Sequence, residues 1–260
     1  MRILVPVKPA ARIREGFVLD AAAVSVPAEA LEQELGESDE LALESALGLA
    51  ERGGDEVLVV AVAGEPHEDA LRACLAKGAD RAIGVWDAAL AAAEPLTVAR
   101  VLAAVAQAEE PELILCGAQS SDAANAATGV ALAGLLDVAR VAVVGAIERD
   151  GARLTVQREL EGGAVEVLTL ATPALLTVQS GVAKSRHATL RAIKQARAKP
   201  LSVLALGDLG LDAGALLASA GSRTVRLRER DRGEGASLLE GEASEIAARI
   251  ATIVTEALSA

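Results

Sequence analysis

Aromatic residues, histidine and cysteine are nearly absent from this chain of 260 residues. It contains one Trp, one Phe, no Tyr, two His and two Cys. Proteins that bind nucleic acid by stacking bases need aromatic side chains, and a formal net charge of −12 repels a polyphosphate backbone. So few His and Cys residues provide no metal-ligand cluster. The composition therefore argues against a nucleic-acid partner and predicts no metal site.

Long apolar runs are also missing. The longest of them, such as residues 57–63, are far shorter than the ~18 residues that indicate a membrane span. The N-terminus enters a strand-like sequence at once, without the layout of a signal peptide. Cys74 and Cys116 lie within apolar patterns and are interpreted as core residues. We expect a soluble, cytoplasmic protein with no direct membrane insertion.

Predicted strands and helices alternate through the first half of the chain. Alternation of this kind is typical of a doubly wound, mostly parallel α/β sheet with helices on both faces. The run 57–62 is apolar throughout, as expected of a strand that is buried on both faces. Apolar runs and helix-end signals predict strands at 3–7, 57–62, 83–86 and 113–116, and helices at 39–52, 66–78, from 95 onward and at 130–136.

The second half of the chain changes character. Alternating residues at 154–156 and 165–170, around a Gly-rich turn, predict an antiparallel hairpin appended to the sheet. Another strand is expected at 173–178. We therefore predict an α/β nucleotide-binding domain over residues 1–200. Residues 201–260, rich in Gly, Asp and Arg and ending in an amphipathic helix at 244–258, are predicted to form an arm that packs on a partner subunit, with a flexible tail as the alternative.

A polar loop between a buried strand and a small-residue helix is the strongest functional signal. The start of a helix presents unpaired N–H groups and partial positive charge. Small side chains at Ala126, Ala127 and Gly129 would let a phosphate approach those groups. In an open parallel sheet this loop, residues 117–125, converges with the loops at 8–10 and 63–65. The alternative is an ordinary strand-to-helix turn.

Catalytic motifs are lacking around this predicted pocket. The sequence has no nucleophile elbow, no Walker loop and no dinucleotide fingerprint. The acidic residues Glu37, Asp39, Glu40 and Glu44 are interpreted as a solvated helix face. We therefore predict a site that holds a nucleotide without cleaving it, in a protein that is not an enzyme and has no catalytic residues.

Several segments, in order, give the chain a family likeness over essentially its full length. It resembles the beta subunit of electron-transfer flavoproteins. The likeness rests on 3–8 (ILVPVK), 39–47 (DELALESAL), 71–82 (LRACLAKGADRA), Gln119 with Asp122 and Thr128-Gly129, 158–163 (RELEGG), 186–190 (RHATL) and the basic run to 201.

This resemblance implies a nucleotide α-hydrolase-like fold and a heterodimer. An alpha subunit would hold most of one FAD, and this chain would bind a structural AMP. Electrons would pass from donor dehydrogenases, such as acyl-CoA dehydrogenases, to a membrane quinone oxidoreductase. Family polar positions at 126–127 are alanines here. Carried over by position, AMP contacts would come from Pro6, Ala63, Gly64, Ala123, Ala126, Ala127 and Thr128.

The resemblance also implies a donor-recognition loop at residues 180–187. Its exposed apolar residue would be Val182, with Arg186 as a second family residue, and an ordinary surface loop is the alternative. Three other functions stay open: a stand-alone adenine-nucleotide-binding protein of the same fold, an enzyme acting on an adenylate, and a scaffold for the alpha subunit with an empty nucleotide pocket.

Overall fold

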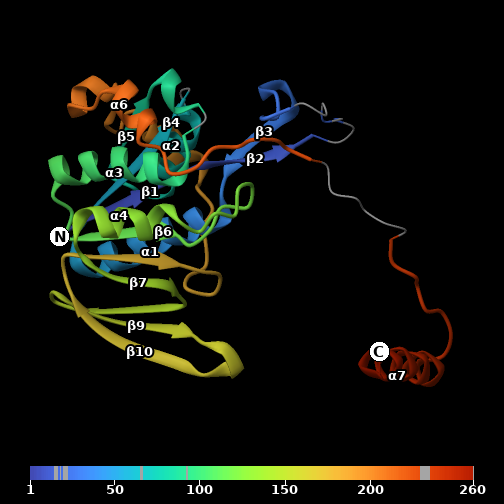
Figure 1. Ribbon diagram of the computed structural model, residues 1–260. Helices are drawn as coiled ribbons and strands as arrows, with labels where there is room; N and C mark the ends of the chain where they lie inside the picture. Colours follow the sequence, from blue (N-terminus) through green and yellow to red (C-terminus); the bar gives the residue numbers. More distant parts are fainter. Residues whose placement is uncertain are drawn as a thin grey trace.

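A seven-stranded sheet forms the centre of the molecule (Figure 1). The computed structural model describes residues 1–14, 17, 19, 23–64, 67–91, 93–228 and 235–259. The strand order is β12-β5-β4-β1-β6-β11-β7, and each neighbouring pair is parallel, so the predicted parallel sheet is confirmed. The strands are β1 (Arg2–Pro6), β4 (Glu56–Ala63), β5 (Arg81–Trp86), β6 (Leu113–Gly117), β7 (Ala139–Val144), β11 (Ala174–Val178) and β12 (Leu201–Leu204).

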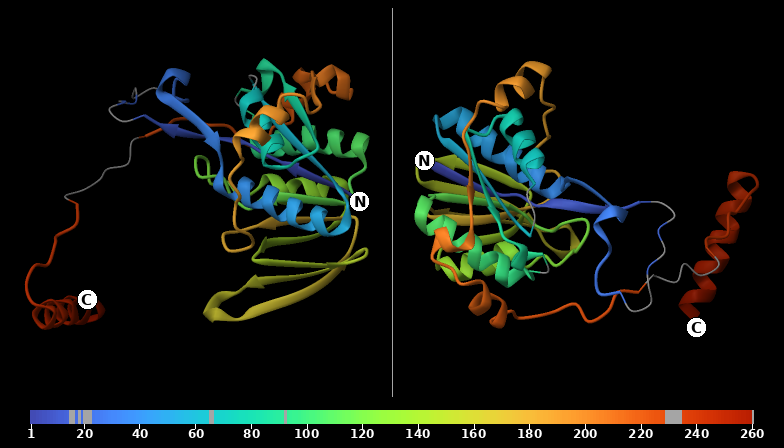
Figure 2. Two further views of the ribbon diagram at one scale, coloured as in Figure 1. Left: turned by 180° about the vertical axis from the view of Figure 1, so that it is seen from behind. Right: turned by 90° about the horizontal axis from the view of Figure 1, so that it is seen from above.

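Helices cover both faces of this sheet (Figure 2). Helices α1 (Glu37–Gly53) and α2 (Glu68–Lys77) pack on one face, and α3 (Pro95–Glu109) and α4 (Thr128–Leu136) on the other. Strand β1 shows the reason. Ile3 and Val5 join the core cluster of α1 and α2, whereas Leu4 joins that of α3 and α4. Side chains alternate across a strand, so a strand between two helix layers must be apolar throughout.

The order of the strands reverses between β1 and β6. From β1 the sheet continues to β4, β5 and β12 on one side, and from β6 to β11 and β7 on the other. Loops that leave two such strands diverge, and a crevice opens at their carboxyl ends. Gly117 ends β6 at this point. A Cβ there would lie 2.4 Å from Oδ1 of Asp39, so the close approach of α1 requires glycine.

The predicted antiparallel hairpin over 154–156 and 165–170 is present, but the sheet that contains it is not part of the central one. It is a separate three-stranded sheet of order β10-β9-β8, made of β8 (Ala146–Asp150), β9 (Arg153–Glu159) and β10 (Val165–Ala171). It is held to the body because Leu154 and Val156 of β9 enter the core cluster of α1 and α2. A further two-stranded sheet, β2 (Pro9–Ile13) with β3 (Leu31–Leu35), extends away from the body (Figure 1).

The expected boundary at residue 201 is wrong. Strand β12 completes the central sheet beside β5, and Leu206 and Leu216 are only 2% and 6% exposed in the core of α3 and α4. The body therefore continues through the short helix α6 (Ala213–Ala218). The 3-10 helices are η1 (Ala28–Ala30), η2 (Ala88–Leu90), η3 (Glu161–Gly163) and η4 (Leu206–Leu209).

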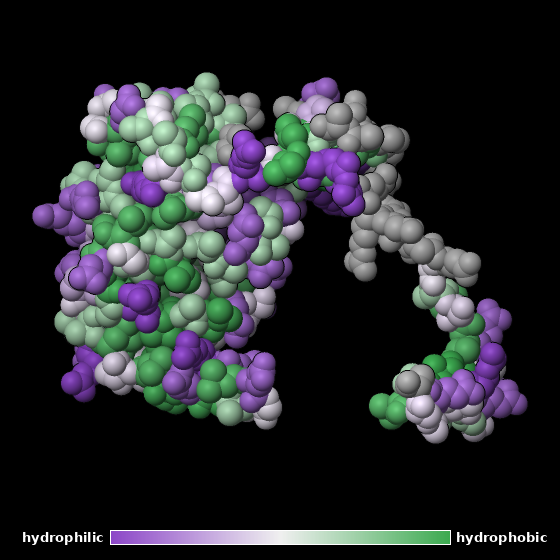
Figure 3. All heavy atoms as spheres, in the orientation of Figure 1, coloured by the Kyte–Doolittle hydropathy of each residue, from purple (hydrophilic) through white to green (hydrophobic). Residues whose placement is uncertain are grey.

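The C-terminal helix α7 (Ala243–Ser259) stands clear of the body, and none of its residues is buried (Figure 3). Before it, the N–H of Leu227 donates to the carbonyl of Ala23 at 2.9 Å, which links the C-terminal segment to the β2–β3 extension. Among the described residues, no helix has both the length and the apolar character that a membrane crossing requires.

Candidate functional site

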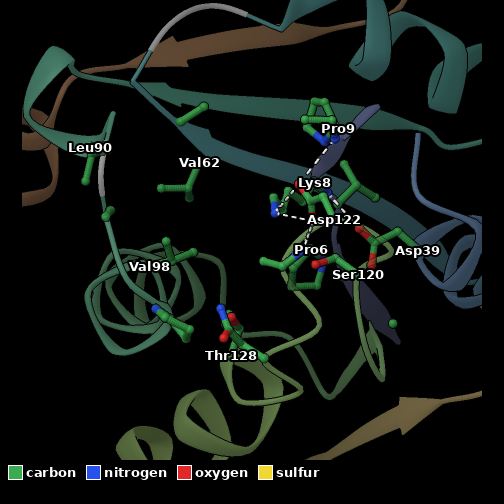
Figure 4. A pocket seen from close by; sticks show the side chains of 18 of the residues that line it. Pro6, Lys8, Pro9, Asp39, Val62, Leu90, Val98, Ser120, Asp122 and Thr128 are labelled. Carbon is green, nitrogen blue, oxygen red and sulfur yellow. Dashed lines mark hydrogen bonds and ion pairs between the residues drawn. The ribbon is translucent and has the colours of Figure 1, made fainter. Parts of the chain in front are cut away.

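A cavity of about 720 Å³ opens at the crevice between the diverging loops (Figure 4). Sites for small molecules and cofactors usually measure ~300–1,000 Å³. Loops after β1, β4 and β6 line it, as the sequence predicted. All seven residues expected to contact a nucleotide lie on its wall: Pro6, Ala63, Gly64, Ala123, Ala126, Ala127 and Thr128.

The start of α4 forms one end of the cavity. The helix begins at Thr128, two residues earlier than predicted, and its N-cap residue Ala127 makes no side-chain cap. The first amides of a helix have no intrahelical acceptor, and the helix dipole adds partial positive charge to them. Ala124 and Ala126 have φ of 53° and 50°, in the left-handed region that costs non-glycine residues roughly 1–2 kcal/mol. This strained turn precedes an uncapped helix start that can accept an anion.

Asp39 points into the site rather than to solvent (Figure 4). Its interpretation as part of a solvated helix face is therefore wrong. Helix α1 starts at Glu37 with Gly36 as N-cap, so Asp39 lies in its first turn. Oδ2 of Asp39 accepts the N–H of Lys8 at 2.8 Å. Burial raises the pKa of Asp39 to about 6, and the N–H groups of Lys8 and Gly117 offset this only in part. The carboxylate therefore joins α1 to two of the loops that line the cavity.

An ion pair crosses the polar side of the cavity (Figure 4). Nζ of Lys8 donates to both carboxylate oxygens of Asp122 at 2.7 Å, and Asp122 also accepts the N–H of Ala11 at 3.2 Å. Burial acts to raise the pKa of Asp122, but Lys8, Ser120 and Ala11 outweigh it and hold the pKa at about 2. Sequence reasoning placed the loop at 8–10 beside the pocket but did not name Lys8, two residues after the end of β1, as a contact residue. The charge of Lys8 is already paired with Asp122. The positive charge that the cavity offers a ligand therefore comes from the start of α4.

The opposite side of the cavity is apolar. Val62, Leu90 and Val98 lie there, from β4, η2 and α3 (Figure 4). Gly64 lets the loop after β4 pack on η2, because a Cβ there would lie 2.5 Å from the Cα of Ala91. The cavity thus offers a non-polar wall for a flat ring and a helix start for an anion.

The two cysteines are core residues, as predicted. Both are free and buried. Burial raises the pKa of the Cys74 thiol to about 12, and it also raises the pKa of Cys116, which borders the cavity. A thiol that stays protonated is a poor nucleophile. Within the described part of the chain, no group of three His, Cys, Asp or Glu residues could hold a metal ion.

The predicted recognition loop is built differently from the expectation. Val182 is half-buried and packs in part against the core cluster of α1 and α2, so only part of its side chain is accessible. Leu190, at the start of α5 (Leu190–Ala196), is 81% exposed. Arg186 is bound by Glu44 and Glu51. Which residues of this segment are exposed depends on how the loop packs on α1. That packing leaves no pattern in a single sequence.

An open parallel sheet with a cavity at its strand-order reversal places the chain among the doubly wound α/β proteins, which bind their ligands at this point of the sheet. Residues 24–209 match the model of the electron transfer flavoprotein domain family. Relatives named electron transfer flavoprotein subunit beta include the three that follow. That of Methylophilus methylotrophus is 38% identical over 263 residues (98% of each chain). That of Bradyrhizobium diazoefficiens is 32% identical over 249 residues, which is 94% of this chain and 99% of the relative. That of Homo sapiens is 38% identical over 177 residues, which is 66% of this chain and 69% of the relative.

The chain belongs to the electron transfer flavoprotein family, as a member of its beta-subunit branch. Membership makes it an electron-transfer subunit of a flavoprotein, and the name of the branch implies an alpha subunit as partner. The family resemblance noted from the sequence is therefore confirmed.

Proposed function

We propose that this chain forms a heterodimer with an alpha subunit, binds one structural AMP and supports an FAD that the alpha subunit mainly holds. The observation that carries the proposal is the convergence of seven expected AMP-contact residues on one cavity at the uncapped start of α4. When bound, the FAD would supply the redox chemistry. The residues of this chain would bind AMP, contact the alpha subunit and present a surface to redox partners.

The AMP phosphate would bind at the amides of residues 126–128. Ala126 and Ala127 have no polar side-chain atom, so the backbone and the Thr128 hydroxyl are the donors there. A hydrogen bond to a charged group contributes ~1.5–3 kcal/mol. The adenine ring would lie against Val62, Leu90 and Val98, where it needs no aromatic partner.

The C-terminal residues would bind the alpha subunit as an arm. After the correction above, this arm comprises the chain beyond α6. Helix α7 places its apolar residues Ile246, Ile250, Ile253 and Ala257 at spacings of four, three and four, which gives one apolar stripe. Such a stripe is normally buried against another element, and α7 has no buried residue in this chain alone.

Donor dehydrogenases, such as acyl-CoA dehydrogenases, would dock on the segment that leads into α5, and a membrane quinone oxidoreductase would accept the electrons. The contact residues would be Val182, which is half-buried, and Arg186, and Leu190, which is 81% exposed, would add an apolar contact at the start of α5. Ile193, 45% exposed on the same helix, would extend it. A small apolar centre with a polar rim suits a transient electron-transfer encounter.

A scaffold role with an empty pocket is the second candidate. One observation favours it: Asp39 and Asp122 place two carboxylates on the cavity wall against one ammonium, that of Lys8. This balance of charge disfavours an anionic ligand, whereas the start of α4 favours one.

Coexpression with the alpha subunit tests the proposed division of labour. We expect a yellow heterodimer with one FAD, and an isolated beta chain that is colourless because it has no dinucleotide fingerprint. Absorbance spectra of both preparations, at matched protein concentration, measure the flavin content. Stoichiometric FAD on the isolated chain would contradict the proposal, and so would a colourless monomer that hydrolyses adenylates.

A further inference from the structure

Helix α4 carries no charged residue, although part of its surface faces solvent. Residues 123–136 contain no Asp, Glu, Lys or Arg, whereas α1, α2, α3 and α7 each carry charges of both signs. A helix that is apolar on all sides is normally buried on all sides. In α4, however, Val130 and Leu135 are 45% and 41% exposed. An outward apolar face of this kind indicates a surface that another chain covers.

The two sides of α4 have different surroundings. Leu132 and Ala133 are fully buried in the core cluster of α3 and α4. Val130, Gly134 and Leu135 lie on the opposite side of the helix, where all three are exposed. A Cβ on Gly134 would meet nothing within 4 Å. The middle of this outward side is therefore open, and the missing side chain lets a partner approach the helix backbone closely.

A bulge in strand β7 adds a further apolar residue beside α4. The register between β7 and β11 shifts, so that Ala142 and Val143 lie opposite the single residue Thr177. Oγ1 of Thr177 accepts the N–H of Val143 at 2.9 Å. Cγ2 of the same Thr177 would lie 2.7 Å from a Cβ on Gly129 of α4. Thr177 thus contacts both elements and places Val143 next to the start of α4.

Val143 has a strained backbone and an exposed side chain. Its φ is 61°, and a β-branched residue at positive φ is a genuine outlier. The residue is 44% exposed. Bulges often re-aim a side chain, and backbone strain of this kind gathers at functional positions. We call Val130, Gly134, Leu135 and Val143 the α4 surface; Figure 3 shows apolar atoms gathered over α4 and β7.

We propose that the α4 surface binds the alpha subunit and forms a contact on the body that is separate from the C-terminal arm. This inference rests on the proposed function, which includes the heterodimer. The name of the beta-subunit branch implies the alpha subunit as partner. A stable interface takes on the order of 20–30 residues from each side, whereas α7 has 17 residues and one apolar stripe. The heterodimer therefore needs a second contact, on the body.

The composition of the α4 surface defines the kind of partner face that fits it. Its centre is apolar and uncharged, and the exposed residues Asp137 and Arg140 lie beside it, at the end of α4 and in β7. An apolar centre with charge only at the rim is typical of protein interfaces. We therefore expect an apolar, uncharged face on the alpha subunit opposite α4.

The test uses the coexpressed heterodimer with bound FAD, whose dissociation on dilution is followed by analytical ultracentrifugation. Leu135→Arg puts a charge on the α4 surface. Arg and Leu have similar helix propensities, and a cation in the last turn suits the helix dipole, so the beta chain should keep its melting temperature. Leu217→Arg is the matched control, because Leu217 is 42% exposed and is also the second-last residue of its helix, α6.

We expect Leu135→Arg to raise the dissociation constant of the heterodimer at least about tenfold, because it buries an unpaired charge in place of an apolar contact. Leu217→Arg should dissociate as the parent does.

A second variant separates the interface from the fold. Asn adopts positive φ more readily than Val, so Val143→Asn should not lower the melting temperature of the beta chain. The same change removes an apolar contact and should raise the dissociation constant of the heterodimer about threefold or more. A merely structural role of Val143 would move both measurements together. Amide hydrogen exchange of residues 130–136 should also be slower in the heterodimer than in the isolated beta chain.

A dissociation constant equal to that of the parent in Leu135→Arg would overturn the inference, and so would equal weakening in Leu217→Arg. If Leu135→Arg lowers the melting temperature, Val143→Asn decides in its place. A beta chain that self-associates, and that Leu135→Arg makes monomeric without weakening the heterodimer, would assign the surface to a second copy instead. Failure of the proposed function looks different: the parent chain would then form no heterodimer with the alpha subunit at all.

Discussion

Replacing Ala127 by Asp should push the stability of the fold and the affinity for AMP in opposite directions. Ala127 is the N-cap of α4 and makes no side-chain cap bond. An Asp at this position can accept the amides of residues 129 and 130, which are the next donors of the first turn. Its carboxylate would also place a negative charge where the AMP phosphate is proposed to bind.

Both effects can be given a magnitude. An acidic N-cap in place of Ala stabilises a helix or a protein by about 0.5–2 kcal/mol. If repulsion by the new carboxylate displaces the phosphate from two of the amides of residues 126–128, the loss is about 3 kcal/mol or more. Since ~1.4 kcal/mol is a factor of ten, AMP affinity should fall at least about 100-fold. Proline at position 128 would be a poorer test, because Ala127 has ψ of −30°, a helical conformation that a following proline disfavours.

Thermal melting and titration calorimetry with AMP, both on the heterodimer, measure the two effects. Ala127→Asn is the matched control, since it caps the helix with nearly the same shape and no charge. It should stabilise the protein and keep most of the affinity. If Ala127→Asp binds AMP as well as the parent does, the phosphate does not lie at the start of α4 and the reasoning is refuted.

Three further predictions concern charge, packing and the arm. The raised pKa of Asp39 makes the folded chain hold a proton that the unfolded chain releases from about pH 4, so stability should fall as pH rises from about 4 to 6. Asp39→Asn should flatten that decrease, measured by denaturant unfolding at several pH values. Asp122→Asn should leave it unchanged, because the lowered pKa of Asp122 confines its contribution to pH below about 4. If the stability of Asp39→Asn falls with pH as steeply as that of the parent, the prediction is contradicted. Gly129→Ala should destabilise the protein by about 1–3 kcal/mol, because its Cβ would lie 2.7 Å from Cγ2 of Thr177. Gly48→Ala, with nothing within 4 Å of its Cβ, should stabilise α1 by roughly 0.5–1 kcal/mol in the same unfolding assay. Changes in the free energy of unfolding with the same sign in both variants would contradict this packing. Leu206→Ala should destabilise the isolated chain by about 2–5 kcal/mol. Ile250→Asp should leave the melting temperature of the isolated chain unchanged but weaken heterodimer formation, measured by analytical ultracentrifugation. If Ile250→Asp forms the heterodimer as tightly as the parent does, α7 does not bind the alpha subunit.

The fold class was predictable because its strongest signals are local. The apolar run 57–62 has no polar residue, so only a strand between two helix layers fits it. The loop at 117–125 was placed correctly for the same reason, since a buried strand and a helix bracket it. Convergence with the loops after β1 and β4 followed from the geometry of parallel sheets.

The misplaced elements lack such signals. Strand β3 reads Leu-Glu-Gln-Glu-Leu and pairs outside the body, where burial imposes no apolar pattern. Strand β12 is partly exposed at the edge of the sheet, so its membership depends on β5 rather than on its own sequence. The inward orientation of the Asp39 side chain and the partial burial of Val182 are set by tertiary contacts. Each depends on a partner far along the chain, Lys8 for Asp39 and the core cluster for Val182.

The nucleotide released from the purified heterodimer is the most direct test of the central claim. The complex is denatured, and the supernatant is analysed by mass spectrometry and quantified against the protein. One AMP per heterodimer, alongside one FAD, is the predicted result. A heterodimer that contains FAD but releases no AMP, even after refolding in the presence of AMP, would contradict the claim and would make the cavity of this chain an empty scaffold feature.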